Sequence, residues 1–104
     1  MATRARMSVE RFVKIAKALA DPTRRRMVDE IREASELTCS CLCAKFETSQ
    51  PTISHHIRTL ADAGVIDVRK EGPYHILTLR DGTLREFTDS LAPATSVARR
   101  PAKK

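Results

Sequence analysis

Residues 49–64 read Ser49-Gln50-Pro51-Thr52-Ile53-Ser54-His55-His56-Ile57-Arg58-Thr59-Leu60-Ala61-Asp62-Ala63-Gly64, and both ends of a helix are marked in them. Ser49 is a good N-cap because its hydroxyl can accept a hydrogen bond from an unpaired first-turn N–H. Pro51 is tolerated because first-turn amides have no intrahelical partner. Gly64 suits the left-handed residue just past a helix end. The stretch therefore predicts one capped helix.

The helix predicted over 49–64 has two different faces. Apolar residues recur at helical spacing and form one stripe: Ile53, Ile57 and Leu60. Ser54, His55 and Arg58 then point away from the stripe. Such a polar face can place hydrogen-bonding tips against base edges and phosphates in the major groove of DNA. The alternative is an ordinary amphipathic surface helix, and the flanking sequence decides between the two.

The sequence before residue 49 predicts three further helices. Apolar residues at helical spacing indicate helices over 8–20 and 22–34. The Asp21-Pro22 pair marks the start of the second, with Asp as N-cap and Pro at the first helical position. A short third helix within 36–48 ends just before Ser49. The third and fourth helices then form a helix-turn-helix, whose second helix enters the major groove.

The sequence after residue 64 changes from helical to alternating periodicity. The runs 65–70 and 75–80 are rich in β-branched residues and flank a Gly-Pro turn, which predicts a β-hairpin. Placed directly after a recognition helix, this hairpin is a wing. Its tip carries Arg69, Lys70 and Tyr74, which suit contacts to phosphates or the minor groove. A last helix is predicted over 83–91.

The predicted fold is mainly α with a β-hairpin wing, a winged helix-turn-helix of four helices, two strands and a fifth helix. Residues 8–92 are assigned to one DNA-binding and dimerisation domain, 1–7 to a flexible N-terminal arm, and 93–104 to a disordered basic tail. A small domain gains from dimerisation, which favours a homodimer surface on the first and last helices over closure of the monomer core alone. The candidate dimer residues are Phe12, Ile15, Leu84, Phe87 and Leu91.

The net charge of +6 is concentrated at the chain ends. Six of the 19 basic residues and none of the 13 acidic ones lie in the arm and the tail, which leaves the middle neutral. Whole-chain basicity is therefore weak evidence for nucleic-acid binding, and only local patches count. One such run is Arg24-Arg25-Arg26. We interpret most of it as a solvated face paired to the acidic residues over 29–33 rather than as phosphate contacts.

Several classes of protein are disfavoured. No stretch approaches the roughly 20 apolar residues that span a bilayer, so no membrane partner is expected. The N-terminus lacks the apolar core of a signal peptide, which predicts a cytoplasmic protein. No nucleophile–base set or phosphate-cradling loop is present, so we expect no enzymatic activity.

Three cysteines lie within five residues, at Cys39, Cys41 and Cys43. An odd number this close together is a poor disulfide framework and suggests metal binding or redox chemistry in a reducing compartment. In a regular helix Cys39 and Cys43 share a face and Cys41 points nearly opposite. The three thiolates converge only if the segment is extended or its first turn unwinds. Because Ser49 follows six residues later, such a change would shift the recognition helix.

The chemistry of the cluster leaves several ligands open. Thiolates select thiophilic ions over magnesium or calcium. Three sulfurs without a nearby histidine suit trigonal arsenite or antimonite, whereas zinc requires a fourth ligand. A cadmium or lead site comes next, followed by a redox or reactive-sulfur switch, although a disulfide within a helix would be strained. Cysteines acting as small buried hydrophobes would account for one of the three but poorly for all of them.

Several segments, taken together and in order, resemble the ArsR/SmtB family of metal(loid)-responsive repressors. Leu19-Ala20-Asp21-Pro22-Thr23-Arg24 is similar to that family's entry into its second helix, and residues 49–57 look like its recognition helix. Ala63-Gly64-Val65-Ile66 and Arg69-Lys70-Glu71-Gly72 continue the resemblance into the wing. The resemblance implies a homodimeric winged helix-turn-helix repressor that leaves a palindromic operator when an inducer, often a toxic metal ion, binds.

The resemblance also implies roles for single residues. The operator contacts carried over are Ser49, Gln50, Thr52, Ser54 and His55, and Arg58 lies on the same outer face. His56 matches a recurrent histidine of the family, and we interpret it as a hydrogen-bonded residue that braces the helix rather than as a ligand or base reader.

The cysteine segment is similar to the E-L-C-x-C-D-L-C motif of the family's arsenical sensors, but Cys39 and Cys41 fall one residue later. The family's D-x-H…H-x-x-E site is absent, since no histidine follows His75, which disfavours a zinc, nickel or cobalt sensor. The main hypothesis is thus an operator-binding repressor that arsenite or antimonite releases from double-stranded DNA. The alternatives are the same fold sensing cadmium, lead or oxidants, and a winged-helix protein-interaction module or thiol-based metal carrier without DNA binding.

Overall fold

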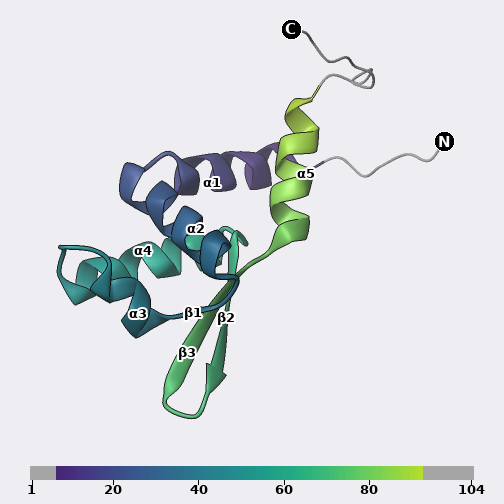
Figure 1. The fold of residues 1–104 in the computed structure, drawn as a ribbon. Helices are drawn as coiled ribbons and strands as arrows, with labels where there is room; N and C mark the ends of the chain where they lie inside the picture. Colours follow the sequence, from purple (N-terminus) through teal and green to yellow (C-terminus); the bar gives the residue numbers. More distant parts are fainter. Residues whose placement is uncertain (1–6, 93–104) are drawn as a thin grey trace, which may run out of the picture.

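The computed structural model describes residues 7–92, which form five helices and three short strands (Figure 1). Nearly all of the predicted arm and the whole predicted tail lie outside these residues. The elements in chain order are α1 (Val9–Leu19), α2 (Pro22–Ala34), β1 (Leu37–Thr38), α3 (Cys39–Ala44), α4 (Gln50–Asp62), β2 (Ile66–Glu71), β3 (Tyr74–Leu79) and α5 (Asp81–Leu91). The mainly α fold with a hairpin wing, predicted from the sequence, is confirmed.

Side-chain caps set where the first four helices begin. Ser8, Asp21, Thr38 and Ser49 each precede a helix and accept a hydrogen bond from the amide three residues later. The distances between donor and acceptor run from 3.0 Å at Asp21 to 3.4 Å at Ser49. Each cap pairs one of the amides that a helix start leaves without a backbone partner. The predicted starts at Asp21-Pro22 and Ser49 are therefore confirmed.

The wing contains one more strand than the sequence predicts. The sheet has the order β1-β3-β2, so β3 is central and hydrogen-bonds on both sides. β2 and β3 form the predicted hairpin, closed by Gly72-Pro73. β1 pairs antiparallel with β3, with Leu37 opposite Leu77 and Thr38 opposite Ile76. Two residues are too few to produce a detectable alternation, which is why the pattern does not reveal β1.

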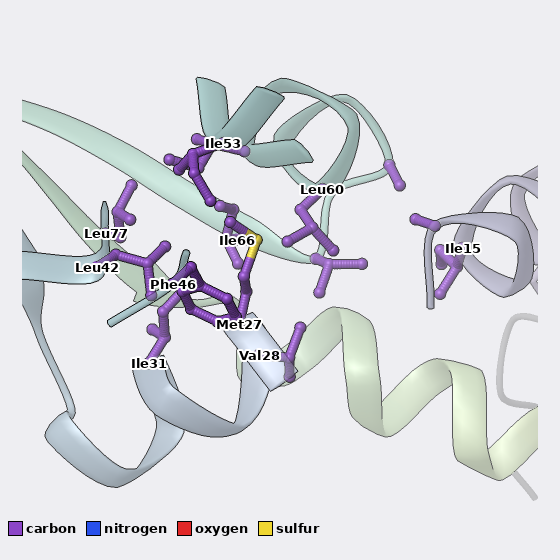
Figure 2. Packing of buried hydrophobic residues seen from close by; sticks show 14 residues of the cluster. Ile15, Met27, Val28, Ile31, Leu42, Phe46, Ile53, Leu60, Ile66 and Leu77 are labelled. Atoms are coloured by element: carbon purple, nitrogen blue, oxygen red, sulfur yellow. The ribbon is translucent and has the colours of Figure 1, made fainter. Parts of the chain in front are cut away.

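One aliphatic core joins the helices to the sheet. Its central members are fully or almost fully buried: Ile15, Met27, Ile31, Leu42, Ile53, Leu60, Val65, Ile66 and Leu77. Figure 2 shows Met27, Leu60 and Ile66 close together in this cluster, which joins α2, α4 and the sheet. Leu42 of α3 and Phe46, two residues after that helix ends, are both in this cluster. None of the helices within residues 7–92 is long and apolar enough to cross a membrane.

The C-terminal end of α4 is closed by a Schellman motif. The amide of Gly64 donates to the carbonyl of Ala61 at 2.9 Å, and the amide of Val65 donates to the carbonyl of Leu60 at 3.0 Å. Gly64 has a φ of +80°, which disfavours side chains, as the sequence predicts for this position. The motif turns the chain from the recognition helix directly into the wing.

We expect Gly64→Ala to lower the free energy of unfolding by about 1–2 kcal/mol, because a Cβ is strained in the left-handed region. Gly82→Ala is the matched control, since Gly82 lies in α5, has no positive φ and has open space around a Cβ. Chemical denaturation of both variants measures the difference. Equal stability of the two variants would contradict this account of the α4 terminus.

Candidate nucleic-acid interface and thiol cluster

The outer face of α4 is open to solvent. Its inward stripe is buried in the core, and the predicted DNA-contacting residues on this helix and its cap are all exposed: Ser49, Gln50, Thr52, Ser54, His55 and Arg58. The hydroxyl of Ser49 donates to that of Thr52 at 2.9 Å and also accepts from the amide of Thr52. These six side chains, on α4 and at its N-terminal cap, are thus all accessible to a binding partner.

The wing presents the other three predicted DNA contacts, but they differ in how they are held. Tyr74 is 56% exposed and Lys70 is exposed as well. Arg69 instead pairs with two carboxylates of the protein, with Nε 2.8 Å from Glu71 and Nη2 3.3 Å from Glu36. Glu36 lies just before β1, so Arg69 connects the wing to the cysteine segment. This bond between distant residues was not predicted.

A hydrogen bond from α2 braces the recognition helix. Arg24 Nη1 lies 3.0 Å from His56 Nδ1, and Arg24 also donates from Nε to the carbonyl of Ala18 at 2.7 Å. Because arginine has only donors, Nδ1 of His56 is the acceptor of this hydrogen bond. The interpretation of His56 as a hydrogen-bonded brace agrees with this contact.

The prediction that most of the arginine run 24–26 is a solvated face is confirmed for Arg25 and Arg26, which are exposed, but not for Arg24. Only Arg25 makes the predicted pair, with Asp29 at 3.3 Å. Arg26 lies over the ring of Phe46 with its guanidinium carbon 4.6 Å from the ring centroid, a cation–π contact. Arg24 is half-buried, and its amide donates to the carboxylate of Asp21. This last bond is the chief reason that the pKa of Asp21 lies below its usual value. Arg24 and Arg26 are structural because they reach partners on other elements, which spacing along one helix does not reveal.

The three cysteines do not converge. They lie in α3, where Cys39 and Cys43 are half-buried against the core and Cys41 is exposed. Burial raises the pKa of the Cys39 thiol, and the nearby Cys43 adds to this effect. Across residues 7–92 no three metal-ligating side chains are grouped closely enough to hold an ion. The helix therefore offers a pair of thiols on one side, and a third thiol can join them only if the first turn changes conformation.

The first and last helices carry exposed apolar side chains. Phe12 and Phe87 stack with ring centroids 4.7 Å apart, and Arg11 pairs with Glu86 at 2.8 Å, so α5 lies beside α1 (Figure 1). Leu91 is 63% exposed and Val9, which the candidate set did not include, is 76% exposed.

Ile15 is a correction to the predicted dimer surface. Its side chain is fully buried in the core of the single chain and so is not available to a partner. Phe12, Leu84 and Phe87 are partly buried and, with Leu91, stay candidates. The apolar face of α1 is wide and includes both core residues and residues at the surface of the chain. Helical spacing alone does not show which of its residues are buried in the core.

Comparison with known proteins gives the family. A family model described as a helix-turn-helix domain matches residues 19–69. The arsenical resistance operon repressor of Staphylococcus xylosus is 38% identical over 84 residues, which cover 80% of this chain and 75% of the repressor. The chain belongs to the ArsR family of transcriptional repressors. The resemblance of the motifs at 19–24 and 49–57 is thereby confirmed.

Two further comparisons cover a similar share of the chain. A helix-turn-helix-type transcriptional regulator of Methanocaldococcus jannaschii is 32% identical over 78 residues, covering 75% of this chain and 88% of that protein. The crystal structure of an ArsR family transcriptional regulator superposes with a TM-score of 0.75 at 28% identity, covering 84% of this chain and 89% of the other. These relatives are transcriptional regulators, and no enzyme family is indicated.

We expect the two adjacent histidines of this ArsR-family chain to respond differently to substitution. His56→Ala removes the acceptor of the Arg24 bond and should lower the free energy of unfolding by about 1–2 kcal/mol. His55→Ala, on the exposed face, should change stability by less than about 0.5 kcal/mol while reducing preference for a specific DNA sequence. Urea denaturation and competition binding against random DNA measure the two effects. An equal loss of stability in both variants would refute the assignment of His56 as the brace.

Proposed function

We propose that this ArsR-family protein represses transcription by binding a palindromic operator as a homodimer and is released when arsenite or antimonite binds its cysteines. The observation that carries the proposal is the distance along the chain between two features. The open polar face of α4 begins at Gln50, only a few residues after the thiol-bearing helix α3 ends at Ala44. A chemical change at the thiols therefore acts next to the DNA-reading surface.

The DNA-binding part of the proposal rests on the exposed set of side chains on α4 and the wing. Gln50, Ser54 and His55 carry donors and acceptors that suit base edges, and Arg58 suits a phosphate. The wing tip adds Lys70 and Tyr74 at the far end of the hairpin, with Arg69 nearer the body of the protein. Operator binding by these groups should weaken as salt rises, since phosphate contacts release counterions.

The ligand part of the proposal rests on the thiol pair. Cys39 and Cys43 share one side of α3, which suits two sulfur bonds to a trivalent arsenic or antimony centre. Each bond forms when a thiol replaces a hydroxyl of arsenous acid and water leaves. Cys41 would supply the third sulfur after the first turn of α3 unwinds. The arsenical relatives support this ligand, and the free energy of coupling needed for regulation is about 1–3 kcal/mol.

The homodimer part of the proposal rests on the apolar surface of α1 and α5. Leu91 and Val9 expose large apolar side chains that a single chain leaves in water, whereas burial of such surface against a second copy is favourable. Phe12 and Phe87 stack on each other between α1 and α5 and are only partly buried, so they would add to the contact. Two recognition helices from one dimer would then read the two halves of a palindrome.

Arsenite should release the protein from an operator fragment selected out of random-sequence DNA by the reduced, ligand-free protein. Cys39→Ser and Cys43→Ser should each raise the arsenite concentration for half-release by about tenfold or more, because each removes a sulfur bond. Ser40→Ala is the matched control, since Ser40 is an exposed residue of the same helix. Fluorescence anisotropy of labelled operator at several salt concentrations provides the measurement.

Parallel titrations with antimonite, cadmium, lead and peroxide separate the proposed ligand from the alternatives. Release by cadmium or peroxide alone would replace arsenite as the signal while retaining the cysteines as the sensor. Release by arsenite from a variant with all three cysteines changed to serine would refute the thiol site altogether. Failure to select any DNA would favour the protein-interaction module.

Leu91→Glu should raise the dimer dissociation constant by about tenfold or more, because it places a carboxylate in an apolar interface. Val68→Glu is the matched control, since Val68 is also an exposed apolar residue but lies on the wing. Sedimentation equilibrium of both variants measures association. A Leu91→Glu variant that associates like the wild type would place the interface elsewhere.

A further inference from the structure

The thiol-bearing helix is joined directly to the wing. Thr38 is both the last residue of β1 and the N-cap of α3, so strand and helix meet with no linker between them. β1 pairs with β3, the central strand of the wing sheet (Figure 1). Thr38 lies opposite Ile76, and Ile76 lies opposite Arg69 on β2. Thr38, Ile76 and Arg69 therefore form one row across the three strands, and Cys39 follows Thr38 directly.

Thr38 also stabilises the first turn of α3, which must unwind before the three thiols can converge. Its hydroxyl accepts a hydrogen bond from the amide of Cys41 at 3.1 Å. Bringing the exposed Cys41 around to the side of Cys39 and Cys43 requires new backbone dihedrals over residues 39–41. That change breaks the bond to Thr38, so the cap is lost when a third sulfur joins the pair.

A second bond ties the same segment to the wing. Glu36, one residue before β1, pairs with Arg69 across β3 at 3.3 Å. Both side chains are about half-exposed, so this pair stabilises the arrangement only weakly. β1 itself is only two residues long. The attachment between the thiol segment and the wing is therefore short enough to be released by a local change.

The other end of α3 is held more firmly. Leu42 and Phe46 are buried in the core, and the guanidinium of Arg26 covers the ring of Phe46. Lys45 pairs with Glu30 of α2 at 3.5 Å. The C-terminal end of α3, toward α4, is thus held by buried side chains and an ion pair, whereas its N-terminal end, toward β1, is held only weakly. A distortion that begins at residues 39–41 is therefore released toward β1.

We propose that the wing is an output of the thiol cluster, with Thr38 and Glu36 as the positioning residues that couple them. Unwinding of the first turn of α3 frees Thr38, detaches β1 from β3 and breaks the pair between Glu36 and Arg69. The wing then loses the support on one edge of its central strand, and its basic tip is no longer held relative to α4. The proposal rests on the proposed thiol site for its ligand, but the coupling itself is a property of the ligand-free fold.

The test uses the full chain in its reduced form, with arsenite as the probe. Tyr74 at the wing tip is the only tyrosine of a chain without tryptophan, so intrinsic fluorescence anisotropy reports on the wing alone. Residue-resolved amide exchange reports on Ile76 and Leu77, the two residues of β3 that pair with β1. Successive amides of a strand point to opposite neighbours, so one of these two amides faces β1 and the other faces β2. We expect arsenite to lower the anisotropy of Tyr74 and to speed exchange at the amide that faces β1, relative to the amides of α2.

Thr38→Val tests the coupling without any ligand. Valine keeps the β-branched shape that suits a strand but removes the hydroxyl acceptor. We expect exchange of whichever of the Ile76 and Leu77 amides faces β1 to rise about fivefold, the typical effect of a lost cap. Thr48→Val, an exposed threonine in the loop before α4, is the matched control and should leave this exchange unchanged. In the operator assay, Thr38→Val should also lower the arsenite concentration for half-release about fivefold, because ligand no longer has to break the cap.

The outcomes separate the coupling from the proposed ligand site. Arsenite that binds and releases operator without any change at Tyr74, Ile76 or Leu77 would overturn the wing proposal and leave the thiol site intact. Arsenite that does not bind would overturn the ligand, and the exchange of Thr38→Val against Thr48→Val would then decide the coupling alone. Equal exchange in these two variants would refute it.

Discussion

Burial of a single apolar stripe on α4 is the constraint on which the rest of the structure depends. Ile53 and Leu60 are fully buried among residues of α2, α3 and the sheet, and the helix has no second apolar face. Packing of the apolar stripe against the core therefore leaves the polar side of α4 exposed to solvent. The cap at Ser49 and the Schellman motif at Gly64 fix the ends of the helix. The orientation of the reading surface is thus a result of apolar packing, not of charge.

Several arginines of this protein stabilise the fold by connecting different elements. Arg24 bonds to His56 and to a carbonyl of α1, Arg26 covers Phe46, and Arg69 joins the wing to the segment before β1. Each of these side chains links two elements that are distant in sequence. The planar guanidinium suits this use because it donates several hydrogen bonds in fixed directions. The neutrality of the middle of the chain is consistent with such internal use of its positive charge.

The short helix α3 has unlike ends, and this asymmetry gives the proposed sensor its direction. Toward α4 it is anchored by buried Leu42 and Phe46, whereas toward β1 it is held by one hydroxyl cap and a two-residue strand. A ligand that needs three thiols must disturb the weaker end, because Cys39 and Cys41 lie there. The wing would then respond directly, since it is attached to this weaker end through β1. This view combines the DNA-reading and thiol parts of the chain in one mechanism.

The sequence by itself determined the helices, the hairpin, the family and the neutral middle of the chain, because caps, periodicity and turn residues are local signals. It also determined that Cys41 points away from Cys39 and Cys43, which follows from helix geometry alone. Only the tertiary structure decided that Ile15 is core rather than surface, that Arg24 reaches His56, and that β1 joins the thiol helix to the wing. These facts depend on residues brought together from distant parts of the chain. Spacing along one element carries no information about its neighbours in space.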